Sequence, residues 1–271
     1  MITQRLNDIE RLQTICEAHD HVQLKLNREM LRKRESSELD FFHYENGELI
    51  AFLGLYPFGS TVEICGMTSP NERRKGHFQR LFEQGISAVR QAGFKKILLN
   101  APAGSDAAKA FLSKQSAVYA FSEHQMKWQQ RPIEDADGVI LRPARADDFE
   151  MRVRLSVTAF GLDEEDARAI EGGVDVDEDT DMHMIEVNEE TIGKIRVSRV
   201  DGQAWIYGFS ILPQHQGKGI GRKVLRQVVK EQSSNGHSVH LEVETKNDQA
   251  LGLYESVGFQ RVHSQDYYRY E

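Results

Sequence analysis

The residues best suited to chemistry in this chain lie in the stretch ILPQHQGKGIG, residues 211–221. Its three alternating glycines, Gly217, Gly219 and Gly221, let the backbone approach a ligand closely. An apolar run precedes the glycines and an amphipathic run follows them, which predicts a strand, a loop and the start of a helix. Because the first N–H groups of a helix have no partner within it, we expect this loop to bind a phosphate group.

Two other phosphate-binding loops require different spacings. The dinucleotide fingerprint needs G-x-G-x-x-G with an acidic residue about twenty positions later, whereas the glycines here run G-x-G-x-G. A Walker loop needs Lys and then Ser or Thr after its last glycine, but Arg222 and Lys223 follow Gly221. A tight strand-to-helix turn without a ligand is the remaining alternative for the loop taken alone.

A second motif lies in residues 240–259, where an alternating strand-like run leads to an asparagine and a short helical run. Residues 216–221 resemble the Q/R-x-x-G-x-G/A pyrophosphate loop of the GNAT superfamily of acyl-CoA-dependent N-acyltransferases. The second motif is similar to the N-x-x-A-x-x-L-Y-x-x-x-G-F pattern of the same family at Asn247, Ala250, Leu253, Tyr254, Gly258 and Phe259. The resemblance covers about residues 139–271.

The resemblance implies that acetyl-CoA is the acyl donor. The backbone from Phe209 to Leu212 would hold the pantetheine arm, the loop would hold the pyrophosphate, and N–H groups near Ile211 would stabilise the oxyanion. Tyr254 would protonate the leaving thiolate, with a packing role as the alternative. The implied CoA-binding residues are Ile211, Leu212, Gln216, Gly217, Lys218, Gly219, Ile220, Gly221, Arg222 and Asn247.

The resemblance does not assign a general base. Some members of the family have a glutamate on the strand that corresponds to residues 204–207, where this chain has no carboxylate. Glu186, Glu242 and Glu244 on neighbouring predicted strands are candidates, each with the alternative of an ordinary exposed residue. Two alternatives need no carboxylate base: a water chain takes the proton, or the substrate amine loses it to bulk solvent.

Composition restricts the class of protein. With 39% hydrophobic and 28% charged residues, the 271-residue chain is expected to form two globular domains. No apolar run reaches the roughly 18 residues of a membrane helix and no secretory signal is visible, so we expect a cytoplasmic protein without a membrane partner. The two cysteines, Cys16 and Cys65, and the ten histidines show no metal-binding spacing, so no metal is expected.

Charge is unevenly distributed, with a formal net charge of +2 in residues 1–130 and −10 in 131–271. This argues against nucleic acid as the partner of the second half. Residues 163–181 carry ten acids and one basic residue, at a place where GNAT folds build the acceptor side of the cleft. We therefore expect a cationic amine acceptor, a small molecule or a peptide, with a solvated acidic surface as the alternative. A homodimer is left open.

The first half is a weaker copy of the second at an offset of 143 residues. Gly76 falls on Gly219, whereas Phe78 replaces the last glycine of the loop. Upstream the offset is 142, which predicts a one-residue change in a hairpin loop. Phe111 and Gly104 fall on the tyrosine and asparagine positions of the second motif, so we expect no catalysis in the first half.

The predicted fold class is α/β, with two tandem GNAT-like domains that each have a mixed central sheet flanked by helices. We expect domains at 1–130 and 139–271 and a linker at 131–138. In the first domain, strands are expected at 2–6, 39–44, 49–55, 62–68, 96–100 and 119–128, and helices at 7–18, 24–34, 78–91 and 106–114. In the second, strands are expected at 139–142, 182–187, 191–200, 205–212, 240–244 and around 261 and 268, and helices at 147–160, 222–232 and 249–255.

Together these features predict an N-acetyltransferase that moves an acetyl group from acetyl-CoA to a primary amine, with its active site in the second domain. The alternative is a non-catalytic acyl-CoA-binding sensor or scaffold on the same fold. Pocket depth, and hence the length of the acyl chain, is not encoded in any motif above.

Overall fold

The computed structural model describes residues 3–34, 38–134, 136–174 and 178–271. The chain divides into two compact units: unit 1 is residues 1–122 with 263–271, and unit 2 is residues 123–262. Each unit therefore contains a short segment that the predicted boundaries assign to the other half of the chain. The boundaries at 1–130, 131–138 and 139–271 stay a prediction for the two sequence repeats.

Unit 1 is built on a mixed sheet in the order β1-β2-β3-β4-β11. The first four strands are β1 (Asp40–Glu45), β2 (Glu48–Phe58), β3 (Thr61–Thr68) and β4 (Lys96–Pro102). The second half of β11 (Phe259–Tyr270) completes the sheet, antiparallel to β4. The helices are α1 (Thr3–Asp20), α2 (Arg28–Lys33), α3 (His77–Ala92) and α4 (Asp106–Leu112).

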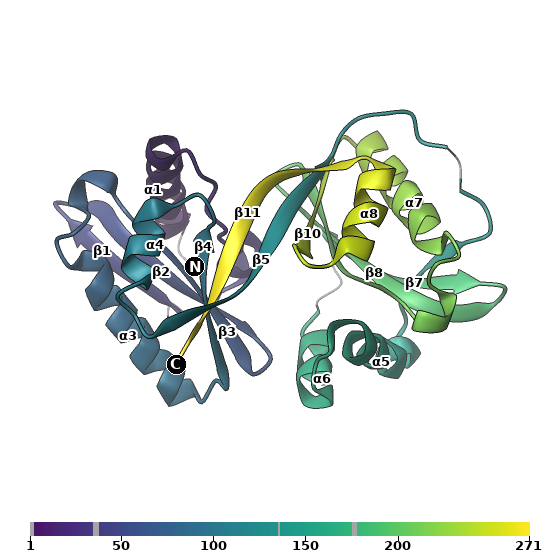
Figure 1. Cartoon of the computed structure of the whole chain (residues 1–271), viewed down its shortest axis with the longest axis horizontal. Helices are drawn as coiled ribbons and strands as arrows, with labels where there is room; N and C mark the ends of the chain where they lie inside the picture. Colours follow the sequence, from purple (N-terminus) through teal and green to yellow (C-terminus); the bar gives the residue numbers. More distant parts are fainter. Residues whose placement is uncertain (1–2, 35–37, 135, 175–177) are drawn as a thin grey trace. The chain divides into compact units, whose positions relative to one another are not determined.

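Helices cover both faces of the unit 1 sheet (Figure 1). Leu81, Phe82 and Val89 form part of an apolar stripe along α3 that packs on one face. Ile9 and Leu12 of α1 pack on the other face. The two faces exist because successive residues of β2 alternate between them.

Unit 2 has a mixed sheet in the order β5-β10-β9-β8-β7-β6. Its strands are the second half of β5 (Ala117–Trp128), β6 (Ile140–Pro143), β7 (Thr180–Val187), β8 (Glu190–Val200), β9 (Gln203–Ile211) and β10 (Ser238–Glu244). The helices are α5 (Phe149–Phe160), α6 (Glu164–Gly172), α7 (Ile220–Ser234) and α8 (Asp248–Val257). Val224, Leu225, Val228 and Val229 of α7 are buried in the main core, which also includes Leu251 of α8.

The predicted fold class is confirmed, and most predicted elements lie within a few residues of the observed ones. The strand predicted at 2–6 is wrong, because α1 begins at Thr3 and its apolar positions, Leu6, Ile9 and Leu12, already follow a helical spacing. The polar segment at 163–181 contains α6, and the two closing strands are one strand, β11. Within the described ranges, no helix combines the length and apolar character needed to cross a membrane.

Candidate active site

The parallel strands β9 and β10 separate partway along their length. Their pairing starts with Gln203 opposite Ser238 and ends with Ile206 opposite Leu241. Beyond that point β9 continues along β8, and β10 continues along β5. In the described parts of the chain, one edge of β9 from 207 to 211 therefore has no paired strand.

A β-bulge in β9 lies where the strands separate. The register of β9 with β8 shifts so that two residues, Gly208 and Phe209, stand opposite one. Gly208 has a φ of +56°, which glycine adopts without the strain that a side chain would cause. The prediction of an uninterrupted strand at 205–212 missed this bulge, although an isolated glycine inside a strand-like run is a sequence signal for one.

The bulge is followed by a peptide group that faces the open edge. The N–H of Leu212 donates to the carbonyl of Ile192 on β8, at 2.8 Å. Because successive peptide groups of a strand point to opposite edges, the N–H of Ile211 is directed to the open edge. The carbonyl of Ile211 accepts a hydrogen bond from Gln216 Nε2 at 2.8 Å. The N–H of Ile211 is thus oriented toward a ligand at this edge, while that of Leu212 is committed to β8.

The glycine loop leads from β9 into α7 with its outer side open. Gly217 and Gly219 have φ values of +72° and +78°, and a Cβ at either would meet nothing within 4 Å. Gly219 is the N-cap of α7, and this fully described helix has neither a side-chain cap nor an acidic residue in its first turn. Its first N–H groups and the positive end of its dipole therefore suit an anion such as a diphosphate.

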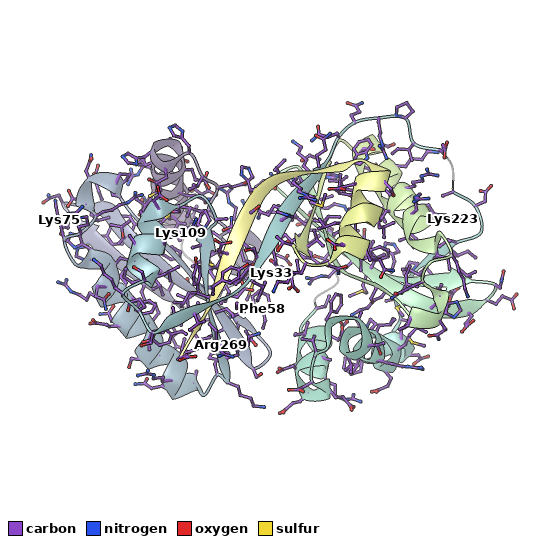
Figure 2. The ribbon with its side chains drawn as sticks, viewed as in Figure 1. Lys33, Phe58, Lys75, Lys109, Lys223 and Arg269 are labelled. Atoms are coloured by element: carbon purple, nitrogen blue, oxygen red, sulfur yellow. The ribbon has the colours of Figure 1, made fainter. Side chains whose placement is uncertain are left out.

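Three basic side chains lie on or beside the loop. Lys223, which is labelled in Figure 2, donates through Nζ to the carbonyl of Asp137 at 2.9 Å. Arg222 donates through Nε to Ser256 Oγ on α8 at 3.1 Å, and Lys218 is exposed. Lys223 is thus engaged with the backbone before β6, and Lys218 and Arg222 are better placed to contact an anion at the loop.

Gly221 and Ile220 have packing roles. A Cβ at Gly221 would lie 3.0 Å from Leu253 Cδ2 and 3.6 Å from Phe209 Cζ. The missing side chain therefore lets α7 approach α8 and β9 closely, which differs from the ligand approach predicted for all three glycines. The side chain of Ile220 is buried in the unit 2 core, so only its backbone is suited to contact a ligand.

Asn247 and Tyr254 belong to α8. Asn247 is the N-cap of this helix, and its side chain accepts a hydrogen bond from the N–H of Ala250 at 3.0 Å. Tyr254 is half-buried and packs edge-on against Phe259, with ring centroids 6.1 Å apart. Burial raises the pKa of Tyr254 to about 12, so its hydroxyl stays protonated at neutral pH. Asn247 therefore fixes the start of the helix that carries Tyr254.

The three candidate bases have different surroundings. Glu186 on β7 accepts a hydrogen bond from Arg142 Nε at 2.7 Å, and β8 separates its strand from β9. Glu244 is exposed near the end of β10. Glu242 is half-buried, directly follows the last residue of β10 that pairs with β9, and accepts a hydrogen bond from Gln125 Nε2 at 2.9 Å. Of the three, Glu242 is the carboxylate nearest in sequence to the point where the strands separate.

The profile of the Acetyltransferase (GNAT) family matches this chain twice, at residues 4–116 and 148–259. The chain belongs to the GNAT acetyltransferase family. The two matches end 143 residues apart, which is the offset between the sequence repeats. The predicted tandem organisation is therefore confirmed.

Individual relatives show how far the likeness extends. N-alpha-acetyltransferase RimI of Mycobacterium tuberculosis is 49% identical over 57 residues, which are 21% of this chain and 35% of RimI. The uncharacterized protein ML0378 of Mycobacterium leprae is 35% identical over 57 residues, 21% of this chain and 15% of that protein. Both matches therefore span well under two thirds of the relatives.

Solved structures agree in fold along nearly the whole chain. A GCN5-related N-acetyltransferase from Sphaerobacter thermophilus has a TM-score of 0.77 at 18% identity, covering 97% of this chain and 91% of that one. A tandem GNAT protein from the clavulanic acid biosynthesis pathway, solved without AcCoA, has a TM-score of 0.66 at 12% identity, covering 98% and 95%. At these identities the likeness concerns the fold alone.

In the first GNAT repeat the loop has a similar backbone conformation, but an aromatic side chain takes the place of its last glycine. Gly76 caps α3 with a φ of +89°, and Arg73 Nε donates to the carbonyl of Thr68 at 3.2 Å, as Gln216 does to Ile211. Phe78, in contrast, packs against Phe111 with ring centroids 5.0 Å apart. Arg73 also forms two hydrogen bonds with a carboxylate of α1, so it is engaged within unit 1.

The bulge has no counterpart in β2 and β3, the corresponding strands of the first repeat, which are fully described. β2 and β3 pair without a register shift from Ala51 opposite Thr68 to Phe58 opposite Thr61. The change of offset from 142 to 143 thus arises at Gly208 inside β9, which corrects the hairpin loop predicted for it.

The offset also returns to 142 after the helices. Ser105 caps α4 where Asn247 caps α8, so Ser105 rather than Gly104 corresponds to the asparagine. Counted from these caps, Leu112 rather than Phe111 corresponds to Tyr254. With either alignment the first repeat has no hydroxyl at this position.

Several acids of the 163–181 segment have local partners. Glu164 pairs with Arg168 at 2.9 Å, and Asp181 pairs with an arginine of β8. Glu171 is buried beside Lys194, which also donates to a serine hydroxyl of α5. Burial lowers the pKa of Lys194, and its hydrogen bond with Glu171 opposes that shift. These pairs reduce the negative field that the sequence alone suggests.

Proposed function

We propose that the protein transfers an acetyl group from acetyl-CoA to a primary amine, and that unit 2 carries the site. The observation that carries this proposal is the bulged, unpaired edge of β9 followed by the open glycine loop and the uncapped start of α7. The first repeat has the loop geometry without the bulge, which supports activity in the second repeat alone.

The reaction needs one bond exchange and one net proton transfer. A C–N bond forms between the amine and the acetyl carbonyl carbon, the C–S bond breaks, the amine loses a proton and the thiolate gains one. In this proposal the N–H of Ile211 stabilises the oxyanion that forms on the carbonyl, and the loop and α7 hold the pyrophosphate of the donor. Gly217, Gly219 and the N–H groups of Ile220 and Gly221 would supply that contact.

The proposed acid is Tyr254. Burial raises the pKa of Tyr254 to about 12, above that of an ordinary thiol, so its hydroxyl carries the proton that a thiolate needs. In this proposal the hydroxyl donates a hydrogen bond to the developing thiolate.

Glu242 is the proposed base. It lies one residue past the last β9–β10 pair and accepts a hydrogen bond from Gln125, which orients its carboxylate. Glu186 is already engaged by Arg142 on the far side of β8. These surroundings support Glu242 over the other two candidates.

The proposed acceptor is a cationic amine. Residues 163–181 carry ten acids and one basic residue, and RimI, the relative matched over 57 residues, is named an N-alpha-acetyltransferase. Both observations are compatible with a peptide or polyamine that presents a free amino group. Acetyl-CoA thiol release, measured with polyamines, aminoglycosides and peptides with free amino groups, tests the proposal.

Turnover with any of these amines separates an enzyme from an acyl-CoA sensor. Tyr254→Phe is the matched variant, because it removes only the hydroxyl and keeps the ring against Phe259. We expect kcat to fall by about 100- to 1000-fold with nearly unchanged CoA affinity. CoA binding without turnover on any amine would instead establish the sensor, and an unchanged kcat with rate-limiting chemistry would return Tyr254 to a packing role.

A further inference from the structure

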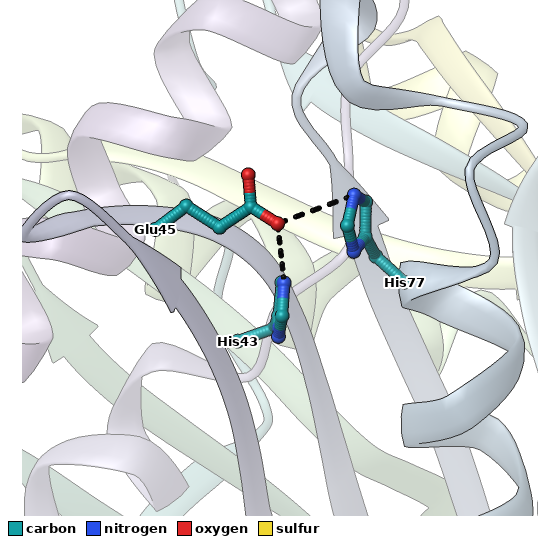
Figure 3. Close-up of side chains that lie close together, drawn as sticks. All are labelled: His43, Glu45 and His77. Carbon is teal, nitrogen blue, oxygen red and sulfur yellow. Dashed lines mark hydrogen bonds and ion pairs between the residues drawn. The ribbon is translucent and has the colours of Figure 1, made fainter.

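A cluster of ligating side chains in unit 1 is separate from the candidate active site. His43 and Glu45 lie two residues apart on β1, so they share a face of the strand, and His77 is the first residue of α3. Figure 3 shows both imidazoles directed toward the Glu45 carboxylate. His43 Nε2 lies 3.1 Å and His77 Nε2 3.6 Å from the same oxygen, Glu45 Oε1.

We propose that His43, Glu45 and His77 bind a divalent transition-metal cation of the zinc class. Their ligand atoms all lie within 4.8 Å of one another. Metal–ligand bonds of about 2.0–2.1 Å in tetrahedral geometry place neighbouring ligand atoms about 3.3 Å apart. This separation lies between the 3.1 Å from His43 Nε2 to Glu45 Oε1 and the 3.6 Å from His77 Nε2 to the same oxygen. Two imidazoles and a carboxylate favour zinc or a neighbouring transition metal over magnesium or calcium.

The surroundings of His77 suit a metal ligand. Both of its ring nitrogens are buried and make no hydrogen bond within the described residues. A buried imidazole normally satisfies at least one nitrogen, because a buried polar group without a hydrogen-bond partner destabilises the fold. A bound cation would satisfy His77 Nε2 directly.

The second repeat shows that the fold does not require these three residues. By strand register, His43 and Glu45 correspond to Ile185 and Val187, since His43 pairs with Ala51 as Ile185 pairs with Gly193. His77 corresponds to Ile220, the first residue of α7. Ile185 and Ile220 belong to the core of unit 2, and Val187 packs against it. An apolar trio in one repeat is thus replaced by three potential ligands in the other.

The neighbouring charges support a cation. The carboxylate of Glu45 supplies the anionic ligand, and its Oε1 faces both imidazoles. Glu72 Oε2 lies 3.9 Å from His77 Nε2 and is the candidate for a fourth ligand, although it also contacts Lys75 Nζ at 2.6 Å. The two rings lie nearly parallel, with centroids 4.4 Å apart and an interplanar angle of 23°, so at least one ring must turn before both lone pairs point at one ion.

The test uses the untagged full-length chain after removal of metal by a chelator. Zn²⁺ is titrated in competition with a chromophoric chelator, Co²⁺ absorption reports four-coordinate geometry, and Mg²⁺ serves as the hard-cation comparison. We expect one equivalent of Zn²⁺ to bind and Mg²⁺ not to displace it.

The decisive variant transplants the residues of the second repeat: His43→Ile, Glu45→Val and His77→Ile. It should fold, because the same apolar trio packs in unit 2, and it should bind Zn²⁺ at least about 100-fold more weakly. His77→Asn should give the same result with a smaller change in packing, and His263→Asn, at an exposed position of β11, is the control that should bind normally. No saturable Zn²⁺ binding by the natural chain, or undiminished binding by the triple variant and by His77→Asn, would overturn the proposal.

Discussion

Replacement of Gly219 by valine should weaken the binding of CoA by at least about 30-fold, and Gly76→Val is its matched control. Both glycines cap a helix in the left-handed conformation, with φ values of +78° and +89°, and a Cβ at either would meet nothing within 4 Å. The two substitutions therefore impose the same backbone strain and the same absence of clash with the protein. They differ only in the repeat that carries them.

The magnitude follows from that conformation. A residue with a Cβ costs roughly 1–2 kcal/mol in the left-handed region, and every 1.4 kcal/mol is tenfold in affinity. Strain alone should then weaken binding by about 5- to 30-fold, if the loop must recover its shape to bind. The valine methyl groups at Gly219 also enter the open space where a diphosphate is proposed to lie, so we expect a loss of at least about 30-fold.

Calorimetric titration with CoA measures the effect, and chemical denaturation measures stability in the same two variants. Both should lose about 1–2 kcal/mol of unfolding free energy, whereas only Gly219→Val should lose CoA affinity. Undiminished affinity in Gly219→Val would refute the assignment of the loop. An equal loss in both variants would show that strain, or a second CoA site in unit 1, explains the result.

Three further predictions concern the base, the acceptor and pH. Glu242→Gln should lower kcat by about 100-fold or more and alter the dependence of kcat on pH, whereas Glu244→Gln should change neither. Equal effects of the two substitutions would show that Glu242 is not the base. For a polycationic amine, kcat/KM should fall as salt is raised from about 0.05 to 0.5 M. Replacing Asp175, Asp177 and Asp179 by Asn should cause a similar loss at low salt; the first two lie outside the described residues. No loss in either experiment would show that the acids only solvate the surface. Burial lowers the pKa of His240 to about 4, below its unfolded value of about 6.5, so its contribution to stability is complete above pH 6.5 and is lost as pH falls toward 4. In the His240→Phe variant, Tm should depend less on pH between about pH 6.5 and 4 than it does in the natural chain. Equal pH dependence of Tm in the two proteins would contradict the reasoning.

Sequence by itself determined the family, the repeat and the position of the loop. Each of these depends on local patterns: glycine spacing, an asparagine followed by a helical run, and apolar periodicity. The structure adds that Gly219 and Asn247 are the N-caps of α7 and α8, a role that was not predicted for either residue. Local patterns were misleading at residues 2–6, where the first turn of α1 was predicted as a short strand.

Only the tertiary structure decided which of the marked residues act together. The missing side chain of Gly221 makes room for Leu253, the N–H of Leu212 is committed to β8, and Glu171 is buried beside Lys194. Each of these roles depends on a partner more than ten residues away, whose position follows from strand order and helix packing. Sequence spacing therefore could not indicate them.

The histidine cluster is the clearest case of this limit. His43 and His77 are 34 positions apart and fit no metal-binding spacing, so the sequence predicted no metal. Antiparallel pairing of β1 with β2 and packing of α3 on that sheet bring both imidazoles to Glu45. Ligand geometry is a property of distances in space, and the chain sets those distances only after it has folded.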